Sequence, residues 1–317
     1  MDLSVVIPVY NEEESLEPLL DELLAALGPT GKSYEIIVID DGSTDGTYPV
    51  LLRFHQREER LKAVRLKRNF GQTAAVAAGF AHAEGDIIVA MDGDGQNDPK
   101  DIPAMLDKLE EGFDLVSGWR FPRQDPLWSR RLPSRMANGL ISWITGVKLH
   151  DYGCTLKALR HDIAREVKLY GEMHRFIPAI AFERGARIAE MKVHHRPRRW
   201  GESKYGMART FRVLFDLLTV KFLLSYATRP LHIFGMVGFL SGGLGFLLAV
   251  YLTLEKIIYQ VAIGGRPLLL LSILLIVIGF QFITMGLLGE MLARTYHESQ
   301  GKTIYSVKDV LDGRKTA

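Results

Sequence analysis

The sequence predicts an α/β protein with a mostly parallel sheet covered by helices on both faces, then an interfacial amphipathic helix and two transmembrane helices. Three observations support this prediction. Strand-like and helix-like runs alternate through the first part of the chain. A cationic amphipathic stretch follows, and the last part holds two uncharged apolar runs of membrane length. The expected domains are residues 1–202, 203–229 and 230–317.

The order of elements starts with Leu3–Val9, a β-branched run typical of a strand buried on both faces. Acidic residues from Glu12 onward then open a helix, where the helix dipole favours negative charge. Leucines from Leu16 to Leu24 continue that helix at helical spacing. Further strands are predicted over Glu35–Ile39, Leu61–Leu66, Asp86–Met91, Asp114–Ser117 and Ile188–His194, and a small-residue helix over Ala74–Ala83.

Composition limits the partners. The chain has 317 residues, 47% of them hydrophobic, and a net charge of +2. With this balance and no nucleic-acid motif, we expect no nucleic-acid partner. The single cysteine, Cys154, excludes an intrachain disulfide and fits a reducing compartment. No basic segment followed by an apolar stretch precedes the first strand, so we expect no signal peptide.

Polar clusters follow the first, second and fourth predicted strands, where parallel sheets bind ligands. Asp92 and Asp94 flank Gly93 after the fourth strand, and paired carboxylates there can hold Mg²⁺ or Mn²⁺ beside a diphosphate. The alternative is an ordinary Asp-Gly turn, but the position after a buried strand favours the cation site. Asp40–Gly46, taken alone, is typical of a turn followed by a helix N-cap.

Together these segments resemble a known family. Val6–Glu13, Asp40–Ser43, Asn69–Gln72 and Met91–Gln96 have the order and spacing of the inverting nucleotide-sugar glycosyltransferases of family 2, which have the GT-A fold. The branch that the chain resembles is the polyprenyl-phosphate glycosyltransferases. It includes dolichyl-phosphate mannose synthases, bactoprenol glucosyltransferases and undecaprenyl-phosphate aminoarabinose transferases. Its further marks here are Ser117–Arg120, Ser129–Arg135, Asp151–Cys154 and Gly201–Tyr205.

The resemblance implies a role for each matching position. Asp92, Asp94 and Gln96 would hold the metal, and Asp92, Asp94 and Asp151 would be the catalytic residues. Asp151 is expected to act as a base or to orient the acceptor. The family often has alanine at the position of Gly93, but both carboxylates are kept. The implied nucleotide-sugar ligands are Pro8, Tyr10, Glu12, Asp40, Asp41, Asn69, Gln72, Asp92 and Gly93.

A basic group near the fifth strand is predicted to bind the acceptor phosphate, because guanidinium forks and hydroxyls suit phosphate. The alternative is a solvated basic face or a membrane-surface patch. A lysine in a loop between glycines is expected to close over the site once donor is bound. The residues are Arg120, Arg130, Arg131, Ser134, Arg135 and Lys204.

The chemistry expected of the acceptor explains why no Ser-His-Asp or Cys-His arrangement is found. A phosphate monoester has a second pKa of about 6, so it is mostly a dianion at pH 7 and needs no strong base to attack a sugar. Catalysis then depends on positioning and charge neutralisation. His150, His194 and His195 are expected to have structural or surface roles.

The C-terminal part is predicted to bind lipid. Met207–Tyr226 has apolar residues at helical steps among cations, which favours an interfacial helix over an ordinary docking helix. Leu231–Leu254 and Leu268–Leu288 are long enough to span a bilayer, and cations before the first span place both termini in the cytoplasm. We therefore expect a multi-pass protein of the inner (plasma) membrane. Gly238 and Gly242 can pack the hairpin or join protomers into a homo-oligomer.

The sequence thus predicts a membrane-bound enzyme that moves a hexose from a nucleotide-sugar donor to polyprenyl phosphate. Glucose from UDP-glucose, transferred to undecaprenyl phosphate with release of UDP, is the first choice. A modified aminoarabinose from UDP and mannose from GDP are alternatives. A processive polysaccharide synthase is disfavoured, because it usually needs more spans and a Gln-x-x-Arg-Trp motif that is absent. The non-enzyme alternative is a membrane-anchored nucleotide-binding regulator.

Overall fold

The structure is a computed structural model, and it forms two compact units: Met1–Leu217 with Thr303–Ala317, and Leu218–Lys302. The structure describes the following residues: 1–121, 138–139, 141–142, 145–167, 169, 173–197, 230–260, 262, 264–299 and 304–312. Outside them lie the predicted phosphate ligands Arg130, Arg131, Ser134, Arg135 and Lys204, and the predicted interfacial helix Met207–Tyr226.

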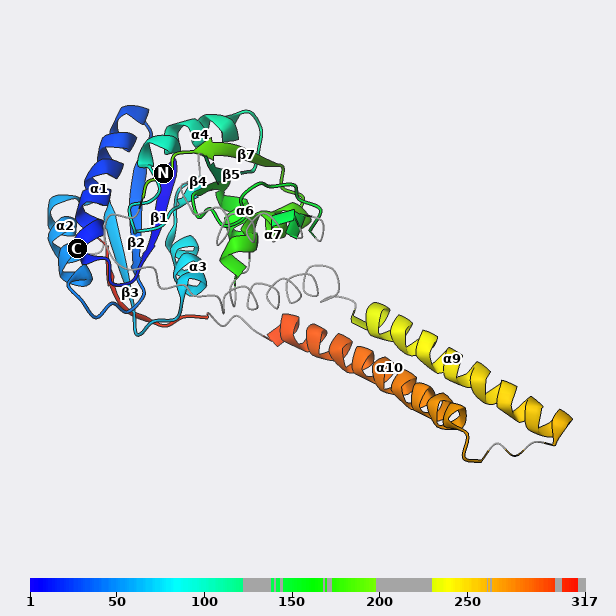
Figure 1. The fold of residues 1–317 in the computed structure, drawn as a ribbon. Coiled ribbons are helices and arrows are strands. Elements are labelled where there is room, and N and C mark those ends of the chain that lie inside the picture. Colours follow the sequence, from blue (N-terminus) through cyan, green and yellow to red (C-terminus); the bar gives the residue numbers. More distant parts are fainter. Residues whose placement is uncertain are drawn as a thin grey trace. The chain divides into compact units, whose positions relative to one another are not determined.

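The first unit is built on one eight-stranded sheet in the order β7-β5-β6-β4-β1-β2-β3-β8 (Figure 1). Six strands run in the same direction, while β6 and β8 are antiparallel to their neighbours. The strands are β1 (Leu3–Val9), β2 (Tyr34–Asp40), β3 (Leu61–Leu66), β4 (Ile87–Ala90), β5 (Leu115–Arg120), β6 (Lys157–Arg160), β7 (Ile188–Val193) and β8 (Val307–Leu311).

The predicted mostly parallel sheet is confirmed, and β1 and β3 have the predicted bounds. The sequence prediction missed β6 and β8. Both are short and carry lysine, arginine or aspartate, so neither gives the apolar run of a buried strand. β6 inserts between β4 and β5, which separates two strands that follow each other in the chain.

Helices cover both faces of the sheet, as predicted. α1 (Glu13–Leu27), α2 (Thr47–Arg57) and α4 (Ile102–Glu110) bury their leucines against the face that carries Val5 and Ile7. α3 (Gln72–His82) packs on the other face with its small residues. A Cβ at Gly79 of α3 would lie 2.1 Å from the Val6 side chain, so this glycine lets the helix approach β1 closely. The remaining helices of this unit are α6 (His161–Glu166), α7 (Ile177–Glu183) and the 3-10 helices η1 (Gly28–Thr30), η2 (Pro99–Asp101) and η4 (Met173–Phe176).

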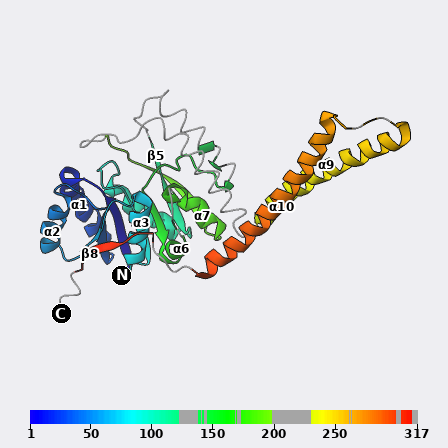
Figure 2. The same ribbon diagram turned by 90° about the horizontal axis from the view of Figure 1, so that it is seen from below.

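The C-terminal strand β8 belongs to this first unit, although it follows the apolar helices in the chain (Figure 2). It lies antiparallel to β3, with Ala63 opposite Leu311 and Val64 opposite Val310. The predicted division describes residues 230–317 as a two-helix transmembrane region with a cytoplasmic C-terminal tail, and β8 lies in that tail. The pairing of β8 with β3 was not predicted, because it joins segments far apart in the chain, a contact that no local pattern encodes.

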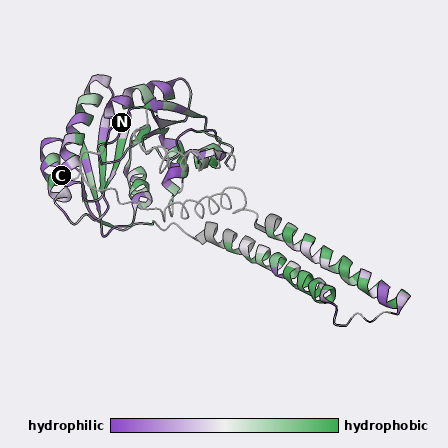
Figure 3. Cartoon of the chain, in the orientation of Figure 1, coloured by the Kyte–Doolittle hydropathy of each residue, from purple (hydrophilic) through white to green (hydrophobic). Residues whose placement is uncertain are grey.

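The second unit contains two long helices, α9 (Pro230–Tyr259) and α10 (Pro267–Ser299). Within them, Phe234–Tyr259 and Pro267–Gly289 are long and apolar enough to cross a membrane, by length and composition. Most of their large apolar side chains are exposed, and Figure 3 shows their predominantly hydrophobic colouring. α9 continues beyond the predicted span Leu231–Leu254, and Glu255 in this extension forms an ion pair of 2.7 Å with Arg266.

Glycines form the contact between α9 and α10. A Cβ at Gly279 of α10 would lie 2.6 Å from the backbone of both Gly238 and Gly242 of α9, and a Cβ at Gly245 would meet the Ser272 carbonyl at 2.7 Å. The helices therefore approach backbone to backbone, as small residues permit in membranes. Of the two roles predicted for the Gly238–Gly242 pair, packing of the hairpin is the one present in this unit.

Replacing Gly279 with leucine is expected to destabilise the helix pair by about 1–3 kcal/mol, the usual range for overpacking. The full chain, in detergent micelles, would be titrated with dodecyl sulfate while helix loss is followed. Gly243→Leu is the matched control, because nothing lies within 4 Å of a Cβ built there. Equal unfolding midpoints for the two variants would contradict the glycine contact.

Candidate active site

The predicted donor residues gather at the carboxyl ends of β1, β2, β3 and β4, which are neighbouring parallel strands, with Asn69 and Gln72 following β3. The loops after β1 and β2 are bonded to each other. The Asn11 backbone N–H donates to Ser43 Oγ at 2.9 Å, and the Thr44 N–H donates to Asn11 Oδ1 at 2.9 Å. Asn11 has a positive φ of 55°, a conformation that asparagine tolerates in tight turns. Tyr10 and Glu12, the other predicted ligands here, lie half-buried on either side of it.

Asp40 ends β2 and Asp41 follows it, and both residues are buried. Asp40 Oδ1 accepts the Ser43 N–H at 2.8 Å, which closes the turn after the strand. The Asp41 oxygens accept the N–H groups of Phe70 and Gly71 at 2.7 and 2.9 Å. Burial raises the pKa of Asp41 despite these hydrogen bonds. Asp41 thus ties the loop after β3 to the loop after β2, and any contact with a nucleotide base would be made in addition to these bonds.

Asp92 lies at the end of β4 and is held from two sides. Its Oδ1 accepts from Gln72 Nε2 and its Oδ2 from Thr155 Oγ1, both at 2.7 Å. Gly93 follows, where a Cβ would lie 2.5 Å from the Val9 side chain, so only glycine fits without a shift. Burial, followed by the negative charge of Asp94, raises the pKa of Asp92 to about 6. This concentration of negative charge is what a divalent cation would neutralise, so the pair Asp92 and Asp94 fits the predicted metal.

The rest of the acidic turn is fixed by backbone contacts. Asp94 Oδ1 accepts the Gln96 N–H at 3.1 Å, and the Gln96 carbonyl accepts the Arg196 N–H at 2.9 Å. Arg196 also forms an ion pair of 2.8 Å with Asp98. The turn is therefore preorganised by the segment that follows β7. The side-chain amide nitrogen of Gln96 faces the Arg196 carbonyl at 3.4 Å, and its metal role stays a prediction.

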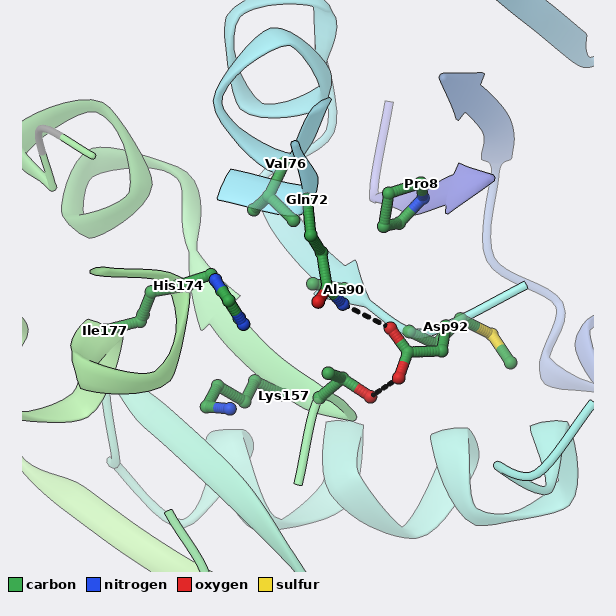
Figure 4. A pocket seen from close by; sticks show the side chains of 10 residues that line it. Pro8, Gln72, Val76, Ala90, Asp92, Lys157, His174 and Ile177 are labelled. Carbon is green, nitrogen blue, oxygen red and sulfur yellow. Dashed lines mark hydrogen bonds between the residues drawn. The ribbon is translucent and has the colours of Figure 1, made fainter. Parts of the chain in front are cut away.

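A pocket opens beside Asp92 (Figure 4). Among predicted ligands, Pro8 and Gln72 line it with Asp92. Further walls come from α3 and from the end of β4. The others come from β6 with the residues just before it and from the η4–α7 segment, neither of which was predicted to belong to the site. Thr155 directly follows Asp151–Cys154, a segment marked by the family resemblance, so the sequence offered a reason to consider it. For His174 the sequence offered no such reason. The other lining residues are Val76, Ala90, Met91, Thr155, Lys157, His174 and Ile177.

Lys157 brings a buried positive charge to this pocket. Its side chain is only 2% exposed, and its ammonium donates to the Cys154 carbonyl. Burial lowers the pKa of Lys157, while nearby anionic groups, Asp151 and Asp92 among them, oppose that shift. Across the pocket, His174 Nδ1 lies 2.8 Å from Thr73 Oγ1. An ammonium has three donors, so Lys157 is chemically suited to an anionic ligand.

Arg120 and Asp151, predicted for separate roles, form one bidentate ion pair. Arg120 Nε and Nη2 donate to Asp151 Oδ2 and Oδ1 at 2.7 and 2.9 Å. Gly153 makes room, because a Cβ there would lie 3.0 Å from Arg120 Nη2. A carboxylate bound this way is a poor base. The geometry therefore favours the orienting role predicted for Asp151 over the base role.

The three histidines near the site occupy structural positions. His150 stacks on Trp119 with ring centroids 4.2 Å apart, and its Nδ1 lies 2.7 Å from Glu190. His194 pairs with Asp101 at 2.7 Å, and this hydrogen bond raises its pKa. His195 bridges to Asn97 through the backbone.

Comparisons with known proteins agree with this arrangement. Residues 4–168 match the family described as "Glycosyl transferase family 2". The dodecaprenyl-phosphate galacturonate synthase of Rhizobium johnstonii is 48% identical and is matched over 100% of this chain and 95% of its own length. The undecaprenyl-phosphate 4-deoxy-4-formamido-L-arabinose transferase of Shewanella sediminis is 41% identical, over 99% of this chain and 94% of its own length.

Solved structures confirm the fold. Glucosyl-3-phosphoglycerate synthase from Mycobacterium tuberculosis, crystallised with Mn²⁺, UDP and phosphoglyceric acid, superposes with a TM-score of 0.56 at 20% identity. The match covers 69% of this chain and 78% of that protein. At this identity the likeness shows a shared GT-A fold alone. The family match spans more than half of the chain and the curated relatives match over its full length, so the chain belongs to glycosyl transferase family 2.

Proposed function

We propose that this protein is a membrane-bound enzyme that transfers a sugar from a nucleoside diphosphate to a polyprenyl phosphate. The observation that carries the proposal is the joining of two parts in one chain. An acidic turn beside a pocket is followed by two apolar helices, and relatives that make polyprenyl-phosphate sugars match across both parts. The acceptor phosphate attacks the anomeric carbon as the bond from that carbon to the diphosphate breaks. No proton need move, because both phosphate groups are ionised at pH 7.

Asp92 and Asp94 are proposed to hold Mg²⁺ or Mn²⁺. A bound cation would offset the charge that develops on the leaving diphosphate. Within the described residues, no three His, Cys, Asp or Glu side chains gather into a metal site. Two protein carboxylates with water and diphosphate oxygens match the usual coordination of Mg²⁺. Gln72 and Thr155 orient Asp92 through their 2.7 Å hydrogen bonds.

We propose that both ends of the chain lie in the cytoplasm and that α9 and α10 both cross the inner membrane. β8, which follows α10, pairs with β3, which precedes α9. The strands of one sheet must lie on one side of a bilayer, so an even number of crossings fits this pairing. The cations that precede the first span support the cytoplasmic side.

For the donor, we propose a uronic acid such as galacturonate in place of the glucose expected from the sequence. The 48% identical relative is named for galacturonate, and the buried Lys157 lies in the pocket beside Asp92. A carboxylate on the sugar would give the Lys157 ammonium a charged partner. A neutral sugar would offer the ammonium no charge.

A donor panel tests these assignments. The full chain in nanodiscs would be given undecaprenyl phosphate and Mg²⁺ or Mn²⁺ with UDP-galacturonate, UDP-glucose, UDP-4-deoxy-4-formamido-arabinose or GDP-mannose. We expect lipid-dependent release of UDP to be fastest with UDP-galacturonate. Faster transfer from UDP-glucose would refute galacturonate as the donor sugar but would still support sugar transfer to polyprenyl phosphate. Nucleotide binding without lipid-dependent release from any donor would favour the membrane-anchored regulator.

A further inference from the structure

The C-terminal strand β8 lies beside the strand that leads into the donor site. β3 ends at Leu66, and the chain then continues to Phe70 and Gly71, whose N–H groups hold Asp41. The Lys67 N–H donates to the Ser306 carbonyl at 3.0 Å, so β8 and the residue before it accompany β3 to its carboxyl end. A segment from the far end of the chain thus borders the loops that carry the predicted nucleotide ligands.

A side-chain contact links β8 to α2. Tyr48 Oη donates to Asp309 Oδ2 at 2.7 Å. Burial of the phenol, together with this hydrogen bond, raises the pKa of Tyr48 to about 12, so the hydroxyl remains a donor at any physiological pH. The Tyr48 ring in turn lies under the Arg65 guanidinium, with the Arg65 Cζ 4.4 Å from the ring centroid. Asp309 therefore positions Tyr48, and Tyr48 positions Arg65.

Arg65 completes the connection to the donor loop. Its Nε lies 3.3 Å from Asp40 Oδ2, and its Nη2 donates to the Ser43 carbonyl at 3.3 Å. Asp40 is fully buried, and its other oxygen accepts the Ser43 N–H. The guanidinium thus contacts both ends of the turn Asp40–Ser43. Asp40 Oδ2 has no hydrogen-bond partner among the described residues, and the Arg65 guanidinium is its ion-pair partner.

We propose that Asp309 of β8 is a positioning residue for the nucleotide-sugar donor, acting through Tyr48 and Arg65 on the turn Asp40–Ser43. The inference rests on the proposed function, in which that turn binds the nucleotide. Without Asp309 the Tyr48 side chain regains rotamer freedom, and Arg65 loses the fixed aromatic ring on which it packs. The free energy of donor binding must then also order the turn, which weakens binding. The chemical step and the lipid site are untouched by this change.

The test uses the full chain in nanodiscs, with kcat and both KM values measured. Asp309→Ala and Tyr48→Phe are each expected to raise the donor KM by about threefold to tenfold, as loss of one hydrogen bond implies. The kcat and the KM for undecaprenyl phosphate are expected to stay within about twofold, since neither depends on this turn. Asp309→Asn keeps an acceptor oxygen and is expected to restore part of the donor affinity.

Lys308→Gln is the matched control. It removes a charge from the neighbouring position of the same strand, which is also exposed. An unchanged donor KM in Asp309→Ala would overturn the inference. A parallel loss of kcat and of both substrate affinities would also overturn it, because that pattern marks general destabilisation.

Calorimetric UDP binding separates this inference from the proposed reaction. Weaker UDP binding by Asp309→Ala than by Lys308→Gln would support the positioning role even if the wild-type chain transferred none of the sugars tested. Equal UDP affinities would overturn the role while leaving the proposed transfer reaction standing.

Discussion

Replacing Asp94 with asparagine is expected to lower the rate of sugar transfer by about 100- to 1000-fold, the range for loss of one preorganised electrostatic contact. Asparagine has nearly the same shape and can still accept the Gln96 N–H, so the turn is expected to keep its conformation. What is lost is a negative charge beside Asp92. The cation would then be held by a single carboxylate and would neutralise less of the charge on the leaving diphosphate.

The measurement is UDP release in saturating Mg²⁺ or Mn²⁺ with the best donor of the panel. Asp86→Asn is the control, because Asp86 is exposed and immediately precedes β4, at the end of the strand opposite Asp92. We expect that variant to turn over normally. Near-normal turnover by Asp94→Asn at saturating metal would remove Asp94 from the metal site.

Replacing Arg120 with alanine is expected to lower the melting temperature by about 10 °C, because removal of one partner of a buried ion pair costs about 3–5 kcal/mol. The Asp151 side chain is 3% exposed and would lose two short hydrogen bonds to the guanidinium. Arg120→Lys keeps the charge but not the fork, so an intermediate loss is expected. Because Arg120 is also predicted to bind the lipid phosphate, the KM for undecaprenyl phosphate should rise in the same variants.

Arg187→Ala provides the comparison. Arg187 pairs with Asp114 at 3.3 Å, but its side chain is 68% exposed, and such pairs contribute little. The combined variant Arg120→Met, Asp151→Asn should recover part of the lost stability, since no buried charge is left unpaired. A melting temperature of Arg120→Ala within about 2 °C of wild type would contradict the buried pair.

The parts of the fold that depend on local pattern could be predicted. Leu3–Val9 is an apolar run broken only by Ser4, and Leu61–Leu66 is apolar apart from Lys62 and Arg65; the ends of these strands place donor residues. The antiparallel strand Lys157–Arg160 could not, because only its two central residues are apolar and it pairs with strands far away in the chain. Thr155 and Lys157 line the pocket because of where this strand lies, so they could not be identified as pocket residues without it.

The sequence also could not predict which of the site residues contact each other. Arg120 and Asp151 were each identified as site residues, but a bidentate contact between them depends on how β5 and the segment before β6 meet in space. Arg130, Arg131, Ser134, Arg135 and Lys204 lie outside the described residues, so their binding of the acceptor phosphate stays a prediction.

The place of β8 in the chain has a consequence for biosynthesis. Synthesis runs from the N-terminus, so the ribosome makes β3 early and its partner β8 only after both apolar helices. Until then β3 is an open edge that can recruit a strand from another nascent chain. A fragment cut before α9 keeps that open edge permanently. A soluble version of the catalytic unit should therefore be engineered by joining residues 304–312 to it through a short linker, which restores the partner strand without the helices.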